Sequence, residues 1–408
     1  MLDPPSGGIH QYTLTMLDAL AQTGLPGWIE LALVLQPNDV ALLPMNLPHA
    51  WRRIIISALD AGAEPGARGA SIPGSAGVDK LPPLGLNSRI AQYLRAKKIE
   101  WLLFTSSYYS GPLPFEFNLP YVMPVHDLQH RLHPEFPEVS ENGEWEQREF
   151  LFRNGIQGAS VVLVDSEVGK QDVLTFYSEH GARSDRIAIL PFLPAAYHHA
   201  AVSDAEKLRV RATYNLPARF LFYPAQFWPH KNHRRIVEAI AEARDRGLII
   251  HAVFCGSATE AIRQATMQEV VAVAQKRGVA DQIRLLGYVP NEDMSPLYAQ
   301  AVALIMPTFF GPTNIPVVEA WASGCPVLTS DIRGIREQVG DAALLVDPRS
   351  VQSITDGILR IWQDAHLRAS LEIRGQERLA AYTPVDFRSR LAEVILNMSH
   401  RAAAREIP

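Results

Sequence analysis

The sequence is poor in cysteine and contains no long apolar run. Its two cysteines, Cys255 and Cys325, both stand in apolar contexts, which excludes a disulfide framework and a cysteine-based metal site. No uninterrupted apolar run reaches the ~18–20 residues that span a bilayer, and no basic-then-apolar signal sequence is present. We therefore expect a cytoplasmic protein whose contact with the inner face of the membrane, if it has any, is peripheral.

The sequence also lacks an excess of charge. The formal net charge is −5, with 20% charged and 47% hydrophobic residues, which is typical of a soluble globular protein. Such a balance gives no general attraction to nucleic acid, so we expect no nucleic-acid partner. At 408 residues the chain is long enough for two domains, each with its own core.

Three motifs are missing as well. No Gly-x-Gly-x-x-Gly follows an expected strand and no Walker loop occurs, which argues against a dinucleotide cofactor and against an NTPase. Nowhere do two aspartates flank a single residue, a pattern that holds a divalent metal together with a diphosphate. We expect neither a cofactor nor a bound metal.

Short apolar runs alternate with helical patterns along the whole chain. This alternation predicts an α/β protein made of two doubly wound, Rossmann-like parallel-sheet domains facing a cleft. A proline-punctuated break near Pro191–Ala200 separates residues 1–195 from 196–380, and residues 381–408 form a helical tail expected to pack back on the N-terminal domain. The expected strands are Ile29–Leu35, Trp101–Phe104, Tyr121–Val125, Ser160–Val164, Ile187–Leu190, Phe220–Tyr223, Ile249–Phe254, Ile283–Leu286, Ala303–Met306, Val327–Thr329 and Ala343–Val346.

The N-terminus departs from this pattern. A glycine turn at Ser6–Gly8 opens the first helix, whereas a doubly wound domain should feed that turn with a strand. Met1–Pro5 is too short and too rich in proline to be one. We expect the first strand to be absent from the chain as given, or Met1–Asp3 to be its frayed remnant.

The most informative segment is Pro307–Pro326. An apolar strand ends at Pro307, a turn follows, and a helix begins with Pro316 in its first turn and stops at Gly324. A strand, loop and helix N-terminus in this order offer free backbone N–H groups and the helix dipole to an anion. The candidate binding residues here are Gly311, Thr313, Asn314, Ile315 and Glu319.

Two other strand ends carry polar groups. After Phe220–Tyr223 comes a loop with Gln226 and Lys231, followed by a helix whose expected N-cap is Asn232. Lys231 is placed where its ammonium can reach a phosphate. After Tyr121–Val125 come His126 and Asp127, at the end of a strand where such domains present reactive groups.

These segments together resemble the retaining, GT-B-fold nucleotide-sugar glycosyltransferases of family 4. Lys231 matches a lysine that grips the donor diphosphate and Glu319 a glutamate that accepts hydrogen bonds from ribose hydroxyls, whereas Gln226 replaces an arginine and Gly311 a second glutamate. The resemblance also implies that Gly8 belongs to a glycine loop facing the diphosphate. It further implies that His126 contacts the transferred sugar and that Asp127 assists the acceptor. We expect Asn314 to substitute for the side chain missing at 311.

What the resemblance implies is a metal-independent, retaining transferase with catalytic residues His126, Asp127 and Lys231. Its donor is a nucleotide diphosphate sugar, with GDP-mannose as the first guess, and its acceptor is a hydroxyl of a glycan or lipid-linked glycan. Two alternatives stay open. One is a nucleotide-sugar epimerase or hydrolase on the same fold. The other is a non-catalytic sugar-nucleotide-binding partner subunit.

Overall fold

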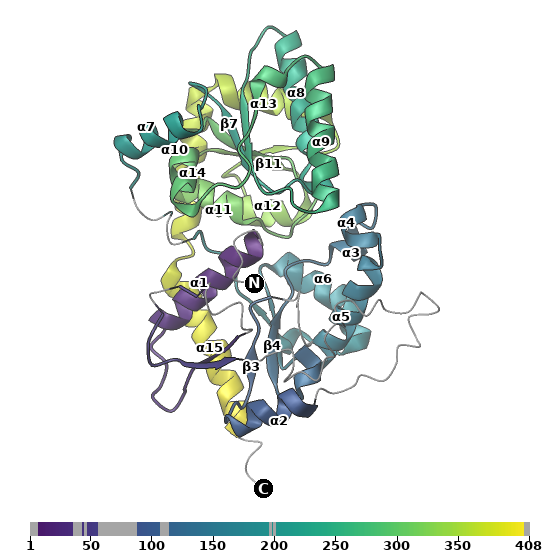
Figure 1. The fold of residues 1–408 in the computed structure, drawn as a ribbon, viewed down its shortest axis with the longest axis vertical. Helices are drawn as coiled ribbons and strands as arrows, with labels where there is room; N and C mark the ends of the chain where they lie inside the picture. Colours follow the sequence, from purple (N-terminus) through teal and green to yellow (C-terminus); the bar gives the residue numbers. More distant parts are fainter. Residues whose placement is uncertain are drawn as a thin grey trace. The chain divides into compact units, whose positions relative to one another are not determined.

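The computed structural model describes residues 7–35, 43–44, 47–55, 88–106, 114–195, 198 and 201–403. Its contacts divide the chain into two units, each built on parallel strands (Figure 1). The first comprises residues 1–135, 139–191 and 384–408, and the second residues 136–138 and 192–383. The boundary between them, after Pro191, lies within the proline-punctuated break. The α/β class with doubly wound parallel sheets is confirmed.

The first unit has a four-stranded sheet in the order β3-β4-β5-β6 and a parallel pair of β1 and β2. The strands are β1 (Ala32–Leu35), β2 (Arg52–Ile55), β3 (Leu102–Leu103), β4 (Tyr121–Pro124), β5 (Val161–Val164) and β6 (Ile187–Ile189). The helices are α1 (Gly8–Gln22), α2 (Ser88–Ala96), α3 (Gln129–Leu132), α4 (Pro137–Ser140), α5 (Glu144–Gly158), α6 (Glu167–Tyr177) and α15 (Pro384–Ala403), with short 3₁₀ turns η4 (Pro114–Phe117), η5 (Ser178–His180) and η6 (Ser184–Arg186).

The C-terminal helix α15 belongs to this first unit although it follows the second along the chain (yellow in Figure 1). The guanidinium of Arg388 donates to the Gln22 side chain of α1 at 3.2 Å, and that of Arg390 to the Ile189 carbonyl of β6 at 3.4 Å. Buried Phe387, Leu391 and Ile395 supply its apolar face.

The second unit contains a six-stranded parallel sheet in the order β12-β11-β10-β7-β8-β9. Its strands are β7 (Leu221–Pro224), β8 (Ala252–Cys255), β9 (Ile283–Leu285), β10 (Ala303–Met306), β11 (Val327–Ser330) and β12 (Leu344–Val346). The helices are α7 (Asp204–Thr213), α8 (His233–Asp245), α9 (Ala261–Lys276), α10 (Asn291–Gln300), α11 (Ile315–Ala322), α12 (Arg333–Val339), α13 (Val351–Gln363) and α14 (Ala365–Ala380), with 3₁₀ turns η8 (Pro229–Lys231) and η9 (Ala280–Gln282).

The strand order of the second unit reverses between β7 and β10, which are neighbours in the sheet. From β7 the chain winds outward through β8 to β9, and from β10 it winds the other way through β11 to β12. The central strands are buried along their whole length because helices cover both faces of the sheet. In open sheets of this kind, ligands bind outside the carboxyl ends of the strands at the reversal point.

Each expected strand is present, with ends shifted by a few residues, and one strand escaped the sequence analysis. The missed strand is β2, which mixes arginines with isoleucines and has only Ile54 buried, so its apolar signal is weak. Met1–Pro5, where the sequence analysis placed the missing or frayed first strand, lies outside the described residues.

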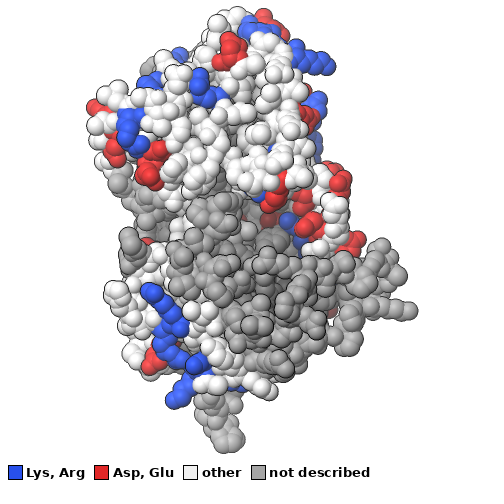
Figure 2. All heavy atoms as spheres, in the orientation of Figure 1, with Lys and Arg blue, Asp and Glu red and all other residues white. Residues whose placement is uncertain are grey.

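Surface charge and helix composition are the features relevant to membrane contact. On the face drawn in Figure 2, acidic and basic side chains are interspersed over the second unit. Within the described residues, no helix combines the length and apolar composition needed to cross a membrane.

Helix α11 is held against α14 by a glycine contact that we expect to be sensitive to substitution. A Cβ atom on Gly375 of α14 would lie 2.3 Å from Cδ1 of Trp321 on α11. Gly375→Ala should therefore destabilise the protein by about 1–3 kcal/mol, because overpacking outweighs the gain of about 1 kcal/mol in helix propensity. Thermal unfolding is the measurement. Gly27→Ala, where a Cβ meets nothing within 4 Å, is the control and should leave the midpoint nearly unchanged.

Candidate functional site

The loops that follow β7 and β10 are joined by a set of short hydrogen bonds. The carbonyl of His230 accepts from the Phe309 backbone N–H at 2.9 Å and from the Thr308 hydroxyl at 3.2 Å. The side-chain amide of Asn232 donates to the carbonyls of Pro307 and Pro348, both at 2.8 Å. These bonds fix the two loops side by side where the strand order reverses.

Asn232 does not cap α8 in the predicted way. It precedes the helix with φ 63°, in the left-handed region, and its side chain makes no capping bond to α8. Its amide is used instead to tie together the loops after β7, β10 and β12. The residue type expected for a cap is correct, but tertiary partners have taken its hydrogen bonds.

Lys231 and Asn314, predicted from separate segments, meet in this place. The Lys231 ammonium donates to Oδ1 of Asn314 at 3.5 Å. Since lysine has only donors, this contact requires the oxygen of the amide to face Lys231 and the nitrogen to face away from it. The Asn314 side chain is 6% exposed, and its Nδ2 has no hydrogen-bond partner among the described residues. A buried donor of this kind favours a ligand that offers an acceptor.

The loop from Gly311 to Asn314 is fixed by its neighbours. Gln338 of α12 bonds both backbone groups of Asn314, accepting from its N–H and donating to its carbonyl at 2.9 Å each. Gly334 of the same helix lies so close to Pro312 that a Cβ there would come within 2.4 Å of its carbonyl oxygen. Thr313 is half-buried, and Ile315 opens α11 with Pro316 in its first turn, as expected.

The structure gives a steric reason for the glycine at 311. Gly311 has φ +123°, a conformation that L side chains rarely adopt, and a Cβ there would lie 2.7 Å from Nδ2 of Asn314. The Asn314 amide therefore occupies the space into which a side chain at 311 would project. The glycine at 311 leaves the space that the asparagine side chain at 314 fills, so the two residue types depend on each other.

Glu319 is buried on α11 and lies beyond the first helical turn, so capping and the helix dipole do not account for it. The Tyr298 hydroxyl donates to its Oε2 at 3.0 Å. The charge of Glu319 also reaches Cys255 on β8, where it adds to the effect of burial in raising the pKa of the thiol. The helix ends as predicted, with Gly324 at φ 65° and the Cys325 N–H donating to the Ala320 carbonyl at 2.8 Å.

The side-chain amide of Gln226 is hydrogen-bonded to neighbouring side chains of the second unit. Its Oε1 accepts from the Trp228 indole at 3.0 Å, and its Nε2 donates to the Ser257 hydroxyl at 3.4 Å. Ser257 also accepts from the buried guanidinium of Arg263, which lies 4.9 Å from the Trp228 ring centre. Sequence reasoning missed Arg263, since a single arginine in a helix carries no motif.

In the first unit, His126 and Asp127 follow β4 as predicted. The His126 ring packs edge-on against Tyr12 of α1 with 4.7 Å between centroids. Burial lowers the pKa of His126 to about 4, although Asp127 and a backbone hydrogen bond at Thr105 act in the opposite direction. The imidazole is therefore neutral at physiological pH. Gly8 is the first residue of α1, one turn before Tyr12.

Asp127 already has two partners. Its Oδ1 accepts from the Gln129 backbone N–H at 3.2 Å and pairs with the Arg148 guanidinium at 3.4 Å. His130 is fully buried and is bound to Glu149 at 2.8 Å, within a cluster that includes Tyr177 and Arg131. These hydrogen bonds lower the pKa of Glu149 to about 2 against the opposing effect of burial. His130 is thus a structural histidine.

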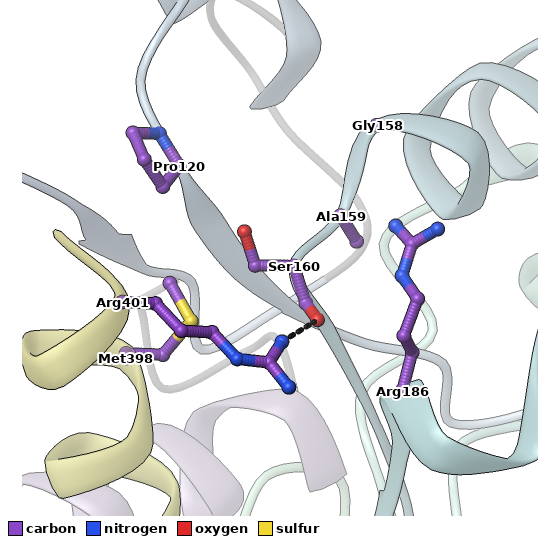
Figure 3. A pocket seen from close by; sticks show the side chains of 7 residues that line it. All are labelled: Pro120, Gly158, Ala159, Ser160, Arg186, Met398 and Arg401. Carbon is purple, nitrogen blue, oxygen red and sulfur yellow. Dashed lines mark hydrogen bonds between the residues drawn. The ribbon is translucent and has the colours of Figure 1, made fainter. Parts of the chain in front are cut away.

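A cavity of about 280 Å³ lies elsewhere in the first unit (Figure 3). It is lined by Pro120, Gly158, Ala159, Ser160, Arg186, Met398 and Arg401, and Arg401 of α15 donates to the Ser160 carbonyl at 3.5 Å. Met398 and Arg401 are on α15, and the other lining residues directly precede β4, β5 or β6. The cavity is therefore at the amino ends of the strands and contains none of the predicted site residues.

Comparisons with known proteins show which family the second unit resembles. Residues 204–378 match the family model described as glycosyl transferases group 1. The chain is 28% identical over 295 residues to the O-antigen chain mannosyltransferase B of Escherichia coli, covering 69% of this chain and 72% of that protein.

Solved structures show the same fold at low identity. The HepE protein of Anabaena in complex with UDP and glucose superposes with a TM-score of 0.70 at 16% identity, covering 96% of each chain. The sucrose-phosphate synthase of Thermosynechococcus elongatus superposes with a TM-score of 0.69 at 18% identity, covering 97% of this chain and 94% of that one. At these identities the likeness establishes the GT-B fold.

The contact between Gly311 and Asn314 can be tested without any ligand. Gly311→Ala should destabilise the protein through both its backbone conformation and its clash with Asn314. In the Asn314→Ala background the clash is gone, so the cost of Gly311→Ala should fall by about 1–2 kcal/mol. Thermal unfolding of the two single variants and the double variant measures this coupling. Strictly additive effects would contradict the steric explanation.

Two buried histidines make stability depend on pH. Burial lowers the pKa of His126 to about 4 and that of His233, which packs against Phe227 and Tyr223, to about 3. The unfolded chain binds protons on both near pH 6.5, whereas the folded chain does not. The free energy of unfolding should therefore fall between pH 6.5 and 5, by up to about 1.4 kcal/mol per pH unit for each histidine.

Unfolding by urea at pH 5, 5.5, 6 and 6.5 measures this slope. His233→Phe keeps an aromatic ring between Phe227 and Tyr223 and removes one of the two protons, so it should reduce the slope by about half. His366→Asn, at an exposed position of α14, is the control and should keep the slope of the unaltered protein. An unchanged slope in His233→Phe would show that His233 is not the group responsible.

Proposed function

We propose that this chain transfers a sugar from a nucleotide diphosphate sugar to a hydroxyl of a glycan or lipid-linked glycan, with retention of configuration, because residues 204–378 match the model of the glycosyl transferases group 1 family. The observation that carries the proposal is the convergence of Lys231 with the Gly311–Glu319 segment at the strand-order reversal of the second unit. The GT-B fold of solved neighbours, among them a protein complexed with UDP and glucose, supports it.

In this proposal, Lys231 and the Ile315 backbone N–H at the start of α11 hold the donor diphosphate. The ammonium lies 3.5 Å from Asn314, directly before that helix, so a phosphate oxygen could contact both. A fixed cation and fixed amides stabilise the charge that develops on the leaving group without reorganising during the reaction. The amide of Gln226 is engaged by Trp228 and Ser257, so Gln226 shapes the loop rather than gripping the phosphate.

Asn314 is proposed to contact the sugar of the donor, and Glu319 its ribose. The Nδ2 of Asn314 is proposed to donate a hydrogen bond to the sugar, in place of a side chain at 311. Glu319, which offers a buried carboxylate held at one oxygen by Tyr298, is proposed to accept from the ribose hydroxyls. Gly311, Thr313 and Ile315 contribute backbone.

The transfer itself is proposed as a front-face substitution without a metal. The bond between the anomeric carbon and the phosphate oxygen breaks, and the acceptor oxygen bonds to the same face of that carbon. The acceptor proton passes to the departing phosphate oxygen, whose charge Lys231 stabilises. From the first unit we propose Gly8 as part of a glycine loop that faces the donor diphosphate, neutral His126 as a contact for the sugar and Asp127 as an aid to the acceptor.

GDP-mannose is the proposed donor, because the Escherichia coli relative is named a mannosyltransferase. The proposed location is the cytoplasm, with peripheral contact at the inner face of the membrane. The experiment below distinguishes the transferase activity from two alternatives. One is hydrolysis or epimerisation of the donor, and the other is donor binding without turnover.

Substitution of Lys231 and Glu319 tests the donor site. Incubation with GDP-mannose, UDP-glucose and UDP-N-acetylglucosamine, with and without alkyl glycoside acceptors, should release nucleoside diphosphate only when an acceptor is present. Lys231→Ala and Glu319→Ala should each lower kcat/KM for the donor by about 100-fold or more. Lys207→Ala removes an exposed lysine paired with Asp204 in the same unit and is the matched control.

Each result assigns a function. Release without acceptor would identify a hydrolase, and binding without release would identify a non-catalytic binder. Full turnover by Lys231→Ala would refute the proposed diphosphate site.

A further inference from the structure

The Glu319 carboxylate is contacted by two buried side chains that come from other parts of the chain. Tyr298 of α10 donates its hydroxyl to Oε2 at 3.0 Å. His198, which precedes α7 by a few residues, places its Nε2 at 3.7 Å from Oε1. The exposed fractions of Tyr298, His198 and Glu319 are 0%, 2% and 5%, so the three groups form one cluster shielded from water.

His198 is fixed by serines at its other ring nitrogen. Its Nδ1 lies 2.9 Å from the Ser295 hydroxyl and 3.0 Å from the Ser323 hydroxyl. Ser295 stands one turn before Tyr298 on α10, and Ser323 is the residue that ends α11. The ring of Tyr298 also meets that of His198 edge-on, with 5.5 Å between centroids. The imidazole therefore bridges α10 and α11 with its Nε2 directed at the carboxylate.

The Glu319 carboxylate takes no part in forming the ends of α11. Burying a carboxylate among polar side chains costs free energy that a well-packed apolar side chain in the same place would avoid. The helix begins with Pro316 in its first turn and ends before Gly324, and the bonds at its C-terminal end use backbone groups and not the Glu319 side chain. What the cluster achieves is to hold the carboxylate in one orientation, which is what recognition of a polar ligand requires.

We propose that Tyr298 and His198 are positioning residues that aim Glu319 at the vicinal diol of a ribose and so determine selectivity for ribonucleotides over deoxyribonucleotides. This inference rests on the proposed function, in which Glu319 contacts the nucleotide. Tyr298 holds one carboxylate oxygen, and His198 faces the other. The carboxylate cannot rotate without losing both contacts, so its free lone pairs stay directed toward the two hydroxyls.

The experiment compares the dissociation constants of GDP and UDP with those of their 2′,3′-dideoxy counterparts by calorimetry on the full chain. In the unaltered protein, the ribonucleotide should bind at least about 10-fold more tightly, and Glu319→Gln should remove most of that preference. Tyr298→Phe should reduce the preference by about 3- to 10-fold while leaving the affinity for the dideoxynucleotide nearly unchanged.

His198 is tested with two substitutions that differ in reach. In His198→Asn the amide reaches only the position of Nδ1, near the serines, and the contact toward Glu319 is lost. In His198→Gln the longer side chain can place its amide near the position of Nε2. We expect Asn to lower the ribose preference and Gln to restore most of it, a difference that a merely structural histidine would not produce.

The matched control is Tyr214→Phe. The Tyr214 hydroxyl donates to Oδ2 of buried Asp293 at 2.6 Å in the same unit, so this variant removes a tyrosine–carboxylate bond of the same kind away from Glu319. It should keep the full preference for the ribonucleotide. Thermal unfolding of each variant shows whether it is folded.

The outcomes separate this inference from the function on which it rests. Loss of the ribose preference in Glu319→Gln but not in Tyr298→Phe or His198→Asn would overturn the positioning role and leave the donor site intact. An unchanged preference in Glu319→Gln, or no binding of either nucleotide by the unaltered protein, would overturn both.

Discussion

The reversal of strand order between β7 and β10 is the constraint on which the second unit depends. Two adjacent parallel strands whose following helices lie on opposite faces leave their carboxyl ends uncovered between those helices. The loop after β7 supplies Lys231 to this place and the loop after β10 supplies Asn314. Two segments more than eighty residues apart in sequence are thus brought together at one candidate site. Hydrogen bonds from Asn232, Thr308 and Phe309 keep the two loops in register.

The candidate site has neutral amides, from Gln226 and Asn314, where the family that the sequence resembles has charged side chains. Asn314 occupies the volume in front of Gly311, and the amide of Gln226 is satisfied by Trp228 and Ser257. Lys231 is left as the cation closest to the start of α11 among the residues predicted for the site. In the proposed donor site, fixed dipoles would therefore carry more of the recognition, and such groups lose little free energy to reorganisation when a ligand binds.

Buried ionisable groups differ in what surrounds them. His126 is kept neutral because burial lowers its pKa to about 4. Glu149 is kept charged because His130, Arg131 and Tyr177 all bond to it. Glu319 is also buried, with the Tyr298 hydroxyl 3.0 Å from one carboxylate oxygen and the His198 ring 3.7 Å from the other. Such partners restrict the orientation of a buried carboxylate, which is the property that the proposed contact with a ribose requires.

The sequence by itself determined the fold class, the strands apart from β2, and the boundaries of α11, because apolar runs, Pro316 and Gly324 act locally. It also indicated Lys231, since a strand end followed by a helix start is a local pattern, and the resemblance to a known family indicated Glu319. Only the tertiary structure decided that Asn232 ties loops instead of capping α8 and that Asn314 fills the space before Gly311. It alone placed His198 and Tyr298 beside Glu319. These contacts join residues that are far apart along the chain, and no local propensity or spacing records which distant side chains become neighbours when a sheet assembles.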